Sequence, residues 1–178
     1  MGICSKKLSQ IKIFRGGFIL KILVLVGTIQ LPFTRMLSEI ENYYINSTNI
    51  EIFAQIGHTP FKSSLFQTYD FLKFDELQKL YIDADLIITH AGVGSIMQGL
   101  KLNKKMIVCA RYSELGEHVD NHQLDILKEF SSKKYIIPWY KEDSITNIIN
   151  QIDCYSFNIF VSNKKPILEY LNNYINLK

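Results

Sequence analysis

The feature that most constrains the fold is a short apolar segment that leads directly into a glycine-rich turn. Residues 86–89 are followed by His90-Ala91-Gly92-Val93-Gly94-Ser95. Glycine lets the backbone turn sharply at the end of a buried strand, and a helix that starts there presents backbone N–H groups and its positive dipole end to an anion. The pattern therefore predicts a strand, a phosphate-binding turn and a helix in succession.

A second polar segment, Gly116-Glu117-His118-Val119-Asp120-Asn121-His122-Gln123, comes after the apolar residues 105–110. The carboxyl ends of parallel strands meet at one edge of a sheet, where open α/β folds bind their ligands, so we expect the two segments to lie close together. Together they predict a pocket for a phosphorylated, hydroxyl-rich ligand. A sugar nucleotide fits that description.

Apolar strands alternate with amphipathic helices along the chain, which predicts an α/β fold with a single Rossmann-like, doubly wound parallel sheet. We expect strands at residues 20–26, 50–56, 66–71, 84–89, 105–110 and 135–137. We expect helices at residues 33–44, after 75, after 95, around 124–130, at 144–152 and at 166–177. A chain of 178 residues suits one domain, which we place at residues 20–178.

Residues 1–19 precede this domain and are basic ahead of an apolar run, as in a signal peptide. Lys21 interrupts that run and no small-residue cleavage site follows it, so we do not predict secretion. Arg15-Gly16-Gly17 has the form of a translated ribosome-binding site. Our hypothesis is that residues 1–19 are a mis-annotated or dispensable N-terminal extension.

Composition excludes several classes of protein. Hydrophobic residues make up 47% and charged residues 21%, which is typical of a globular domain, and a net charge of +3 is too small to indicate nucleic-acid binding. Cys4, Cys109 and Cys154 are far apart and form no C-x-x-C pair, which supports neither a disulfide framework nor a thiolate zinc site. We therefore expect a reducing, cytoplasmic setting.

The glycine-rich turn also has simpler interpretations. Ser95 could cap a helix, and short glycine motifs have a high false-positive rate. A nicotinamide site is less favoured, because G-x-G-x-x-G would require glycine where Met97 stands.

His118 and His122 are four residues apart, and on a helix this spacing would bring both rings to one face. The pattern lacks a convincing third ligand, because Asp120 and Asn121 suit a helix cap at least as well as a metal. We therefore predict no metal site.

Three segments in order carry a resemblance to a known family: Val26-Gly27-Thr28-Ile29-Gln30-Leu31-Pro32-Phe33, Ala84 through Ser95, and Gly116 through Gln123. Over residues 20–137 the chain resembles the C-terminal, donor-binding domain of family 28 glycosyltransferases, and more closely the free-standing form that is half of a bipartite enzyme. The third segment is more similar to the bacterial exopolysaccharide or capsule branch than to the eukaryotic branch, which acts on dolichol-linked chitobiose. The resemblance implies the C-terminal half of a GT-B fold.

The resemblance also implies the residues that bind a UDP-sugar. The donor diphosphate would be held from the two glycine loops by Gly27, Thr28, Gln30, His90, Gly92, Val93, Gly94 and Ser95. Gln98 stands where the family usually has a glutamate for the ribose hydroxyls, and Asn121, His122 and Gln123 match the segment that contacts the sugar. His118, with Glu117 beside it, is the local candidate for a general base.

The implied activity is inverting transfer of a hexose, with galactose favoured, from UDP to a polyprenyl-diphosphate-linked saccharide in exopolysaccharide or capsule synthesis. The UDP-sugar is a substrate, and no cofactor or metal is implied. The alternatives are a UDP-N-acetylglucosamine transferase subunit, a non-catalytic sugar-nucleotide-binding subunit and an unrelated nucleotide-binding domain.

The resemblance further implies a partner. A complete enzyme of this kind has two Rossmann-like domains, and the chain has length for one. We expect a membrane-anchored, acceptor-binding subunit that recruits this chain to the inner face of the cell membrane. The amphipathic residues 166–177 would pack either on their own sheet or against that partner.

Overall fold

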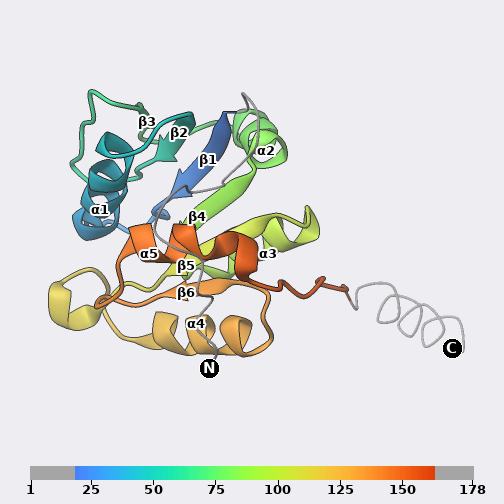
Figure 1. The fold of residues 1–178 in the computed structure, drawn as a ribbon. Helices are drawn as coiled ribbons and strands as arrows, with labels where there is room; N and C mark the ends of the chain where they lie inside the picture. Colours follow the sequence, from blue (N-terminus) through green and yellow to red (C-terminus); the bar gives the residue numbers. More distant parts are fainter. Residues whose placement is uncertain (1–18, 163–178) are drawn as a thin grey trace, which may run out of the picture.

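The structure, a computed structural model, describes residues 19–162 as a six-stranded parallel sheet with helices on both faces (Figure 1). The strands are β1 (Leu20–Leu25), β2 (Ile50–Gln55), β3 (Gln67–Tyr69), β4 (Leu86–His90), β5 (Lys105–Cys109) and β6 (Ile137–Trp139). Their spatial order is β3-β2-β1-β4-β5-β6, and every neighbouring pair is parallel. The predicted doubly wound α/β fold is confirmed.

Five α-helices cover the sheet in two layers. They are α1 (Thr34–Ile45), α2 (Phe74–Asp83), α3 (Val93–Lys101), α4 (His122–Ser132) and α5 (Ile145–Asn150). Helices α1 and α5 share one buried cluster with one face of the sheet, while α2, α3 and α4 share a second cluster with the other face. Because both faces are covered, the central strands are nearly continuous apolar runs, as parallel strands usually are.

The alternation of side chains along β1 shows how one strand serves both layers. Ile22 and Val24 point into the cluster with α1, and Leu23 and Leu25 point into the cluster with α2 and α3. Successive strand residues face opposite sides, so a strand buried on both sides must be apolar throughout. This is why the run at residues 20–26 was recognisable from the sequence.

The last strand differs from its expected position. It spans Ile137–Trp139 and includes Pro138, whereas the sequence placed it at residues 135–137 and ended it before that proline. Proline is tolerated in a strand at the edge of a sheet, and β6 is an edge strand. The predicted extension at residues 1–19, apart from Ile19, and the predicted helix at 166–177 lie outside the described residues. Within residues 19–162, no helix is long and apolar enough to cross a membrane.

The strand order creates one switch point. From β1 the chain runs outward to β2 and β3, and it then returns to the opposite side of β1 as β4 (Figure 1). The loops that follow β1 and β4 therefore leave the sheet in opposite directions. Doubly wound sheets bind ligands in the crevice formed at this point.

Candidate functional site

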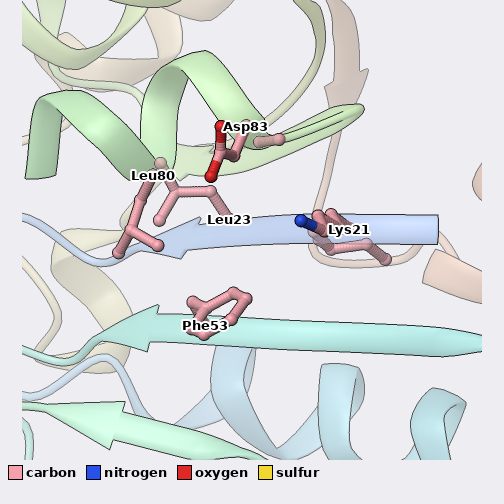
Figure 2. Close-up of a pocket in the computed structure, with 7 residues that line it drawn as sticks. Lys21, Leu23, Phe53, Leu80 and Asp83 are labelled. Atoms are coloured by element: carbon pink, nitrogen blue, oxygen red, sulfur yellow. The ribbon is translucent and has the colours of Figure 1, made fainter. Parts of the chain in front are cut away.

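One cavity beside β1 is too small to be the functional site. It has a volume of about 40 Å³ and lies between β1, β2 and α2, lined by apolar groups of Leu23, Phe53 and Leu80 (Figure 2). Pockets for small molecules usually measure about 300–1,000 Å³, so this one is too small for a nucleotide. It also reaches Lys21 near the beginning of β1, away from the carboxyl ends of the strands.

The start of α3 offers open hydrogen-bond donors at the switch point. Gly92 is the N-cap residue, no side chain caps the helix, and Ile96 N–H is the first amide to bond back, to Gly92 O at 3.1 Å. Val93, Gly94 and Ser95 thus form a first turn whose N–H groups are unused among the described contacts. Such a turn attracts an anion. Ser95 is the third helical residue and not the cap.

Glycine is present at positions 92 and 94 of this turn for different physical reasons. A Cβ on Gly92 would lie 2.1 Å from Nε2 of His90, so packing requires glycine there. A Cβ on Gly94 would meet no other atom within 4 Å, so packing does not require glycine there. The empty space beside Gly94 lies at the open helix end, where a phosphate could approach the backbone closely.

His90 is enclosed between the two glycine loops. A Cβ on Gly27 would also meet its ring, at 2.6 Å from Nε2, and Gly27 itself has a φ of +89° that favours glycine. Burial, together with the nearby charge of Arg111, lowers the pKa of His90 from 6.5 to about 4. The ring is therefore neutral near pH 7, and it fills the space between the loops.

The remaining predicted diphosphate and ribose residues lie around this point. Thr28 and Gln30 are exposed in the loop after β1, and Gln98 is half-buried on α3. None of the three has a side-chain hydrogen bond among the described contacts. These three side chains therefore have no structural role among the described hydrogen bonds.

Arg111, which the sequence reasoning missed, connects the loop after β1 with the loop after β5 through hydrogen bonds. Its Nη1 donates to Leu31 O at 2.8 Å and to Glu117 O at 2.9 Å, and its Nη2 donates to Val26 O at 2.7 Å. Its guanidinium stacks on Phe33, 4.5 Å from the ring centroid. Burial lowers its pKa to about 10, which still leaves it charged near pH 7. A charged residue directly after the apolar β5 strand was the available signal.

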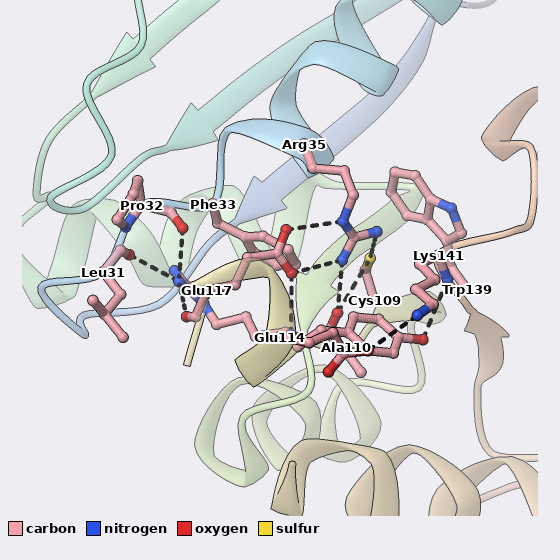
Figure 3. Close-up of polar contacts among 12 residues, drawn as sticks. Leu31, Pro32, Phe33, Arg35, Cys109, Ala110, Glu114, Glu117, Trp139 and Lys141 are labelled. Carbon is pink, nitrogen blue, oxygen red and sulfur yellow. Dashed lines mark hydrogen bonds and ion pairs between the residues drawn. The ribbon is translucent and has the colours of Figure 1, made fainter. Parts of the chain in front are cut away.

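Glu117 forms a largely buried ion pair with Arg35. Arg35 holds both its carboxylate oxygens, from Nε and Nη2 at 2.9 Å each, and Tyr112 N–H donates to Oε2 at 3.1 Å (Figure 3). Burial would lower the pKa of Arg35, but the hydrogen bond and charge of Glu117 outweigh it and raise that pKa. This geometry argues against the catalytic role expected for Glu117.

Gln123 and Asn121 also have internal partners. Gln123 is 4% exposed, and its Oε1 accepts a hydrogen bond from Arg111 N–H at 3.0 Å. The exposed Asn121 accepts from the backbone N–H of Ser113 at 2.9 Å and from its hydroxyl at 3.0 Å. The expectation that Gln123 contacts the sugar is not favoured, because its side chain is buried and occupied.

His118, Asp120 and His122 form a cluster in the turn that leads into α4. Nδ1 of His118 lies 3.2 Å from Oδ1 of Asp120, and Nδ1 of His122 contacts the same oxygen. The two imidazole rings are 4.7 Å apart between centroids. The helix begins only at His122, so it is this turn, and not a helical face, that brings the two rings together.

The strand order, the open helix end at the switch point and the glycine-lined loops define a Rossmann-like α/β domain. The family model described as the glycosyltransferase family 28 C-terminal domain matches residues 21–164. The chain therefore belongs to this glycosyltransferase family.

Curated relatives share shorter segments with the chain. UDP-N-acetylglucosamine transferase subunit ALG13 of Candida albicans is 36% identical over 93 residues, which are 52% of this chain and 30% of that protein. The subunit of the same name in Saccharomyces cerevisiae is 45% identical over 53 residues, 30% of this chain and 24% of that protein. The chain thus matches less than a third of these relatives' length. These relatives do not support the expected exopolysaccharide branch.

Solved structures show the same fold. The solution structure of ALG13 aligns with a TM-score of 0.59 and 21% identity, covering 86% of this chain and 95% of that one. MurG of Acinetobacter baumannii aligns with a TM-score of 0.53 and 17% identity, covering 79% of this chain and 42% of that one. The chain thus corresponds to a part of the longer MurG chain.

Proposed function

We propose that this chain is the donor-binding subunit of a glycosyltransferase that uses UDP-N-acetylglucosamine. The observation that carries the proposal is the uncapped first turn of α3 at the switch point, with open space beside Gly94. A diphosphate is the anion that best suits several N–H donors in one turn. Thr28 and Gln30 would contact it from the opposite loop, and Gln98 would reach the ribose.

The choice of donor sugar rests on the relatives. The two curated relatives described above are named UDP-N-acetylglucosamine transferase subunits, which supports this sugar above the galactose favoured by the sequence. Sugar discrimination depends on a few hydrogen bonds around the hydroxyl and acetamido groups. Asn121 and His122, both exposed in the turn before α4, are the residues proposed to make them.

The proposed chemistry is electrostatic stabilisation of the leaving group. Negative charge builds up on the UDP diphosphate as the acceptor hydroxyl attacks the anomeric carbon, and fixed N–H donors of Val93, Gly94 and Ser95 would stabilise it. Glu117 is paired with Arg35, and the side chain of His118 is only 10% exposed, which limits access of an acceptor hydroxyl to its ring. We therefore assign the base that takes the hydroxyl proton to a partner subunit.

Exposed apolar side chains on the same edge support a partner. Val93 is 48% exposed, Leu115 49% and Val119 78%, and all three follow the carboxyl ends of β4 or β5. Apolar groups around a polar site are typical of a surface that a second protein or domain covers. The proposed partner is membrane-anchored and binds the lipid-linked acceptor, which would place this chain at the inner face of the membrane.

The test combines binding and transfer. The purified chain is titrated calorimetrically with UDP, UDP-N-acetylglucosamine, UDP-galactose and UDP-glucose, and each radiolabelled donor is then supplied with membranes from the source organism. We expect UDP binding by the chain and transfer of N-acetylglucosamine to lipid only when chain and membranes are combined. Transfer of galactose alone would overturn the proposed donor, and absence of UDP binding would overturn the proposed site.

A further inference from the structure

The turn before α4 holds three metal-ligating side chains, and only one of them, His122, has a role in the proposed binding of the donor sugar. We propose that His118, Asp120 and His122 bind one divalent transition-metal cation of the Zn²⁺ type. One nitrogen or oxygen from each residue lies within 4.8 Å of the others. The sequence predicted no metal site because it offered no convincing third ligand, with Asp120 and Asn121 at least as suited to a helix cap.

The backbone of the turn holds the three groups in place. His122 N–H donates to Oδ1 of Asp120 at 3.1 Å, a bond that orients the carboxylate. The 3.3 Å bond from Asp120 N–H to Nδ1 of His118 uses the lone pair that the ion would take, and it is given up on binding. The carboxylate therefore sits between two imidazoles without depending on a distant segment. Preorganisation of this kind reduces the entropy lost when a ligand set closes around an ion.

The separations suit a small cation. Bonds of about 2.0 Å to nitrogen and oxygen in a tetrahedral site place ligand atoms about 3.3 Å apart. The distance from Nδ1 of His118 to Oδ1 of Asp120 is 3.2 Å, which needs little adjustment. His122 already contacts the same carboxylate, so its ring would have to move aside only enough to admit the ion.

The donor set selects the kind of metal. Two imidazoles and one carboxylate favour Zn²⁺, Co²⁺ or Ni²⁺, whereas Mg²⁺ and Ca²⁺ prefer oxygen ligands alone. The side chains of Asp120 and His122 are 56% and 52% exposed, and that of His118 is 10% exposed. The ion would be held at the surface with a coordination position open to solvent, as in zinc sites with three protein ligands.

The site can be tested without donor, acceptor or partner, so its outcome is independent of the proposed function. Zn²⁺ is titrated into the full chain, freed of any purification tag, while histidine side-chain resonances are followed by NMR. The chain has four histidines. We expect the signals of His118 and His122 to shift together at one equivalent of Zn²⁺, while those of His58 and His90 stay in place.

A pair of matched variants identifies the carboxylate. Asp120→Asn should weaken Zn²⁺ binding at least tenfold, roughly the lower limit seen when a metal site loses even a supporting group. Asp125→Asn makes the same change at an exposed position on the first turn of α4 and should leave affinity unchanged. Circular dichroism in EDTA verifies that both variants are folded.

Three results would overturn the proposal. The first is the absence of any Zn²⁺-dependent shift of His118 and His122. The second is equal affinity in the two asparagine variants. The third is binding that moves only cysteine signals, which would place the metal on thiols elsewhere in the chain.

Discussion

Gly92 and Gly94 stand two residues apart in one turn, yet a methyl group should have opposite effects at them. Gly94→Ala adds a side chain in open space, so stability should stay unchanged or rise by up to about 1 kcal/mol. UDP affinity should fall at least about tenfold, or ~1.4 kcal/mol, because the methyl group stands where the diphosphate approaches. Calorimetric titration with UDP measures the loss.

Gly92→Ala is the matched control. Its methyl group would collide with the ring of His90, so we expect a loss of stability of about 1–3 kcal/mol in urea unfolding. If Gly94→Ala binds UDP as tightly as the original chain does, the diphosphate does not approach the backbone at this position, and the proposed site is wrong.

His90 should make the protein less stable in acid. Its pKa in the folded protein is about 4, below its ordinary value of 6.5, so the unfolded chain takes up a proton at a pH where the folded chain does not. Stability should therefore fall as pH drops from about 6.5 to 4, by roughly 3 kcal/mol from this group. The measurement is urea unfolding across that pH range.

Two variants show how much of this pH dependence comes from His90. His90→Gln should flatten the dependence, whereas His58→Gln, at an exposed position, should leave it unchanged. Equal slopes for the two variants would show that other groups cause the acid sensitivity.

At the scale of elements, the loops after β1 and β5 are held together by the buried Arg111 and the half-buried Arg35. Glu117→Gln removes the charge that Arg35 pairs with, and we expect a loss of stability of about 2–4 kcal/mol because a partly buried guanidinium is left without its counter-ion. UDP affinity should fall as well, since Arg111 also bonds to Glu117 O and to the loop after β1.

Glu114→Gln provides the comparison within the same loop. Glu114 pairs with Lys141 at the surface, where solvent screens the interaction, so this variant should keep both its stability and its UDP affinity. Chemical denaturation of both variants distinguishes the two pairs. A Glu117 variant as stable as the Glu114 variant would mean that the buried pair does not hold these loops.

At the scale of the whole molecule, the exposed apolar side chains of Val93, Leu115 and Val119 should affect sugar transfer only in the presence of a partner. Val119→Asp places a charge among groups proposed to be covered, so transfer with added membranes should fall at least about tenfold while UDP affinity remains unchanged. Ile82→Asp, at an exposed position near the end of α2, should preserve both properties. Full transfer by the Val119 variant would remove this edge from the interface.

The sequence by itself determined the order of strands and helices along the chain and the sheet edge at which we propose that a ligand binds. Strands buried on both faces must be apolar throughout, and turns that start a helix at a phosphate site need glycine, so both signals are local. The same local signals cannot show which polar side chains are free. From their neighbours in the chain, Glu117 looked like a catalytic residue and Gln123 like a sugar contact.

Only the tertiary structure decided their roles. Arg35 lies 82 residues before Glu117, and the loop carbonyl of Leu31 lies 80 residues before Arg111, so these contacts form only when β1, β4 and β5 lie side by side. A buried charge must find a partner, and in this fold the nearest one comes from a distant segment. Asp120, which from the sequence suited a helix cap at least as well as a metal, joins two histidines through a local arrangement, because the chain turns before α4 begins.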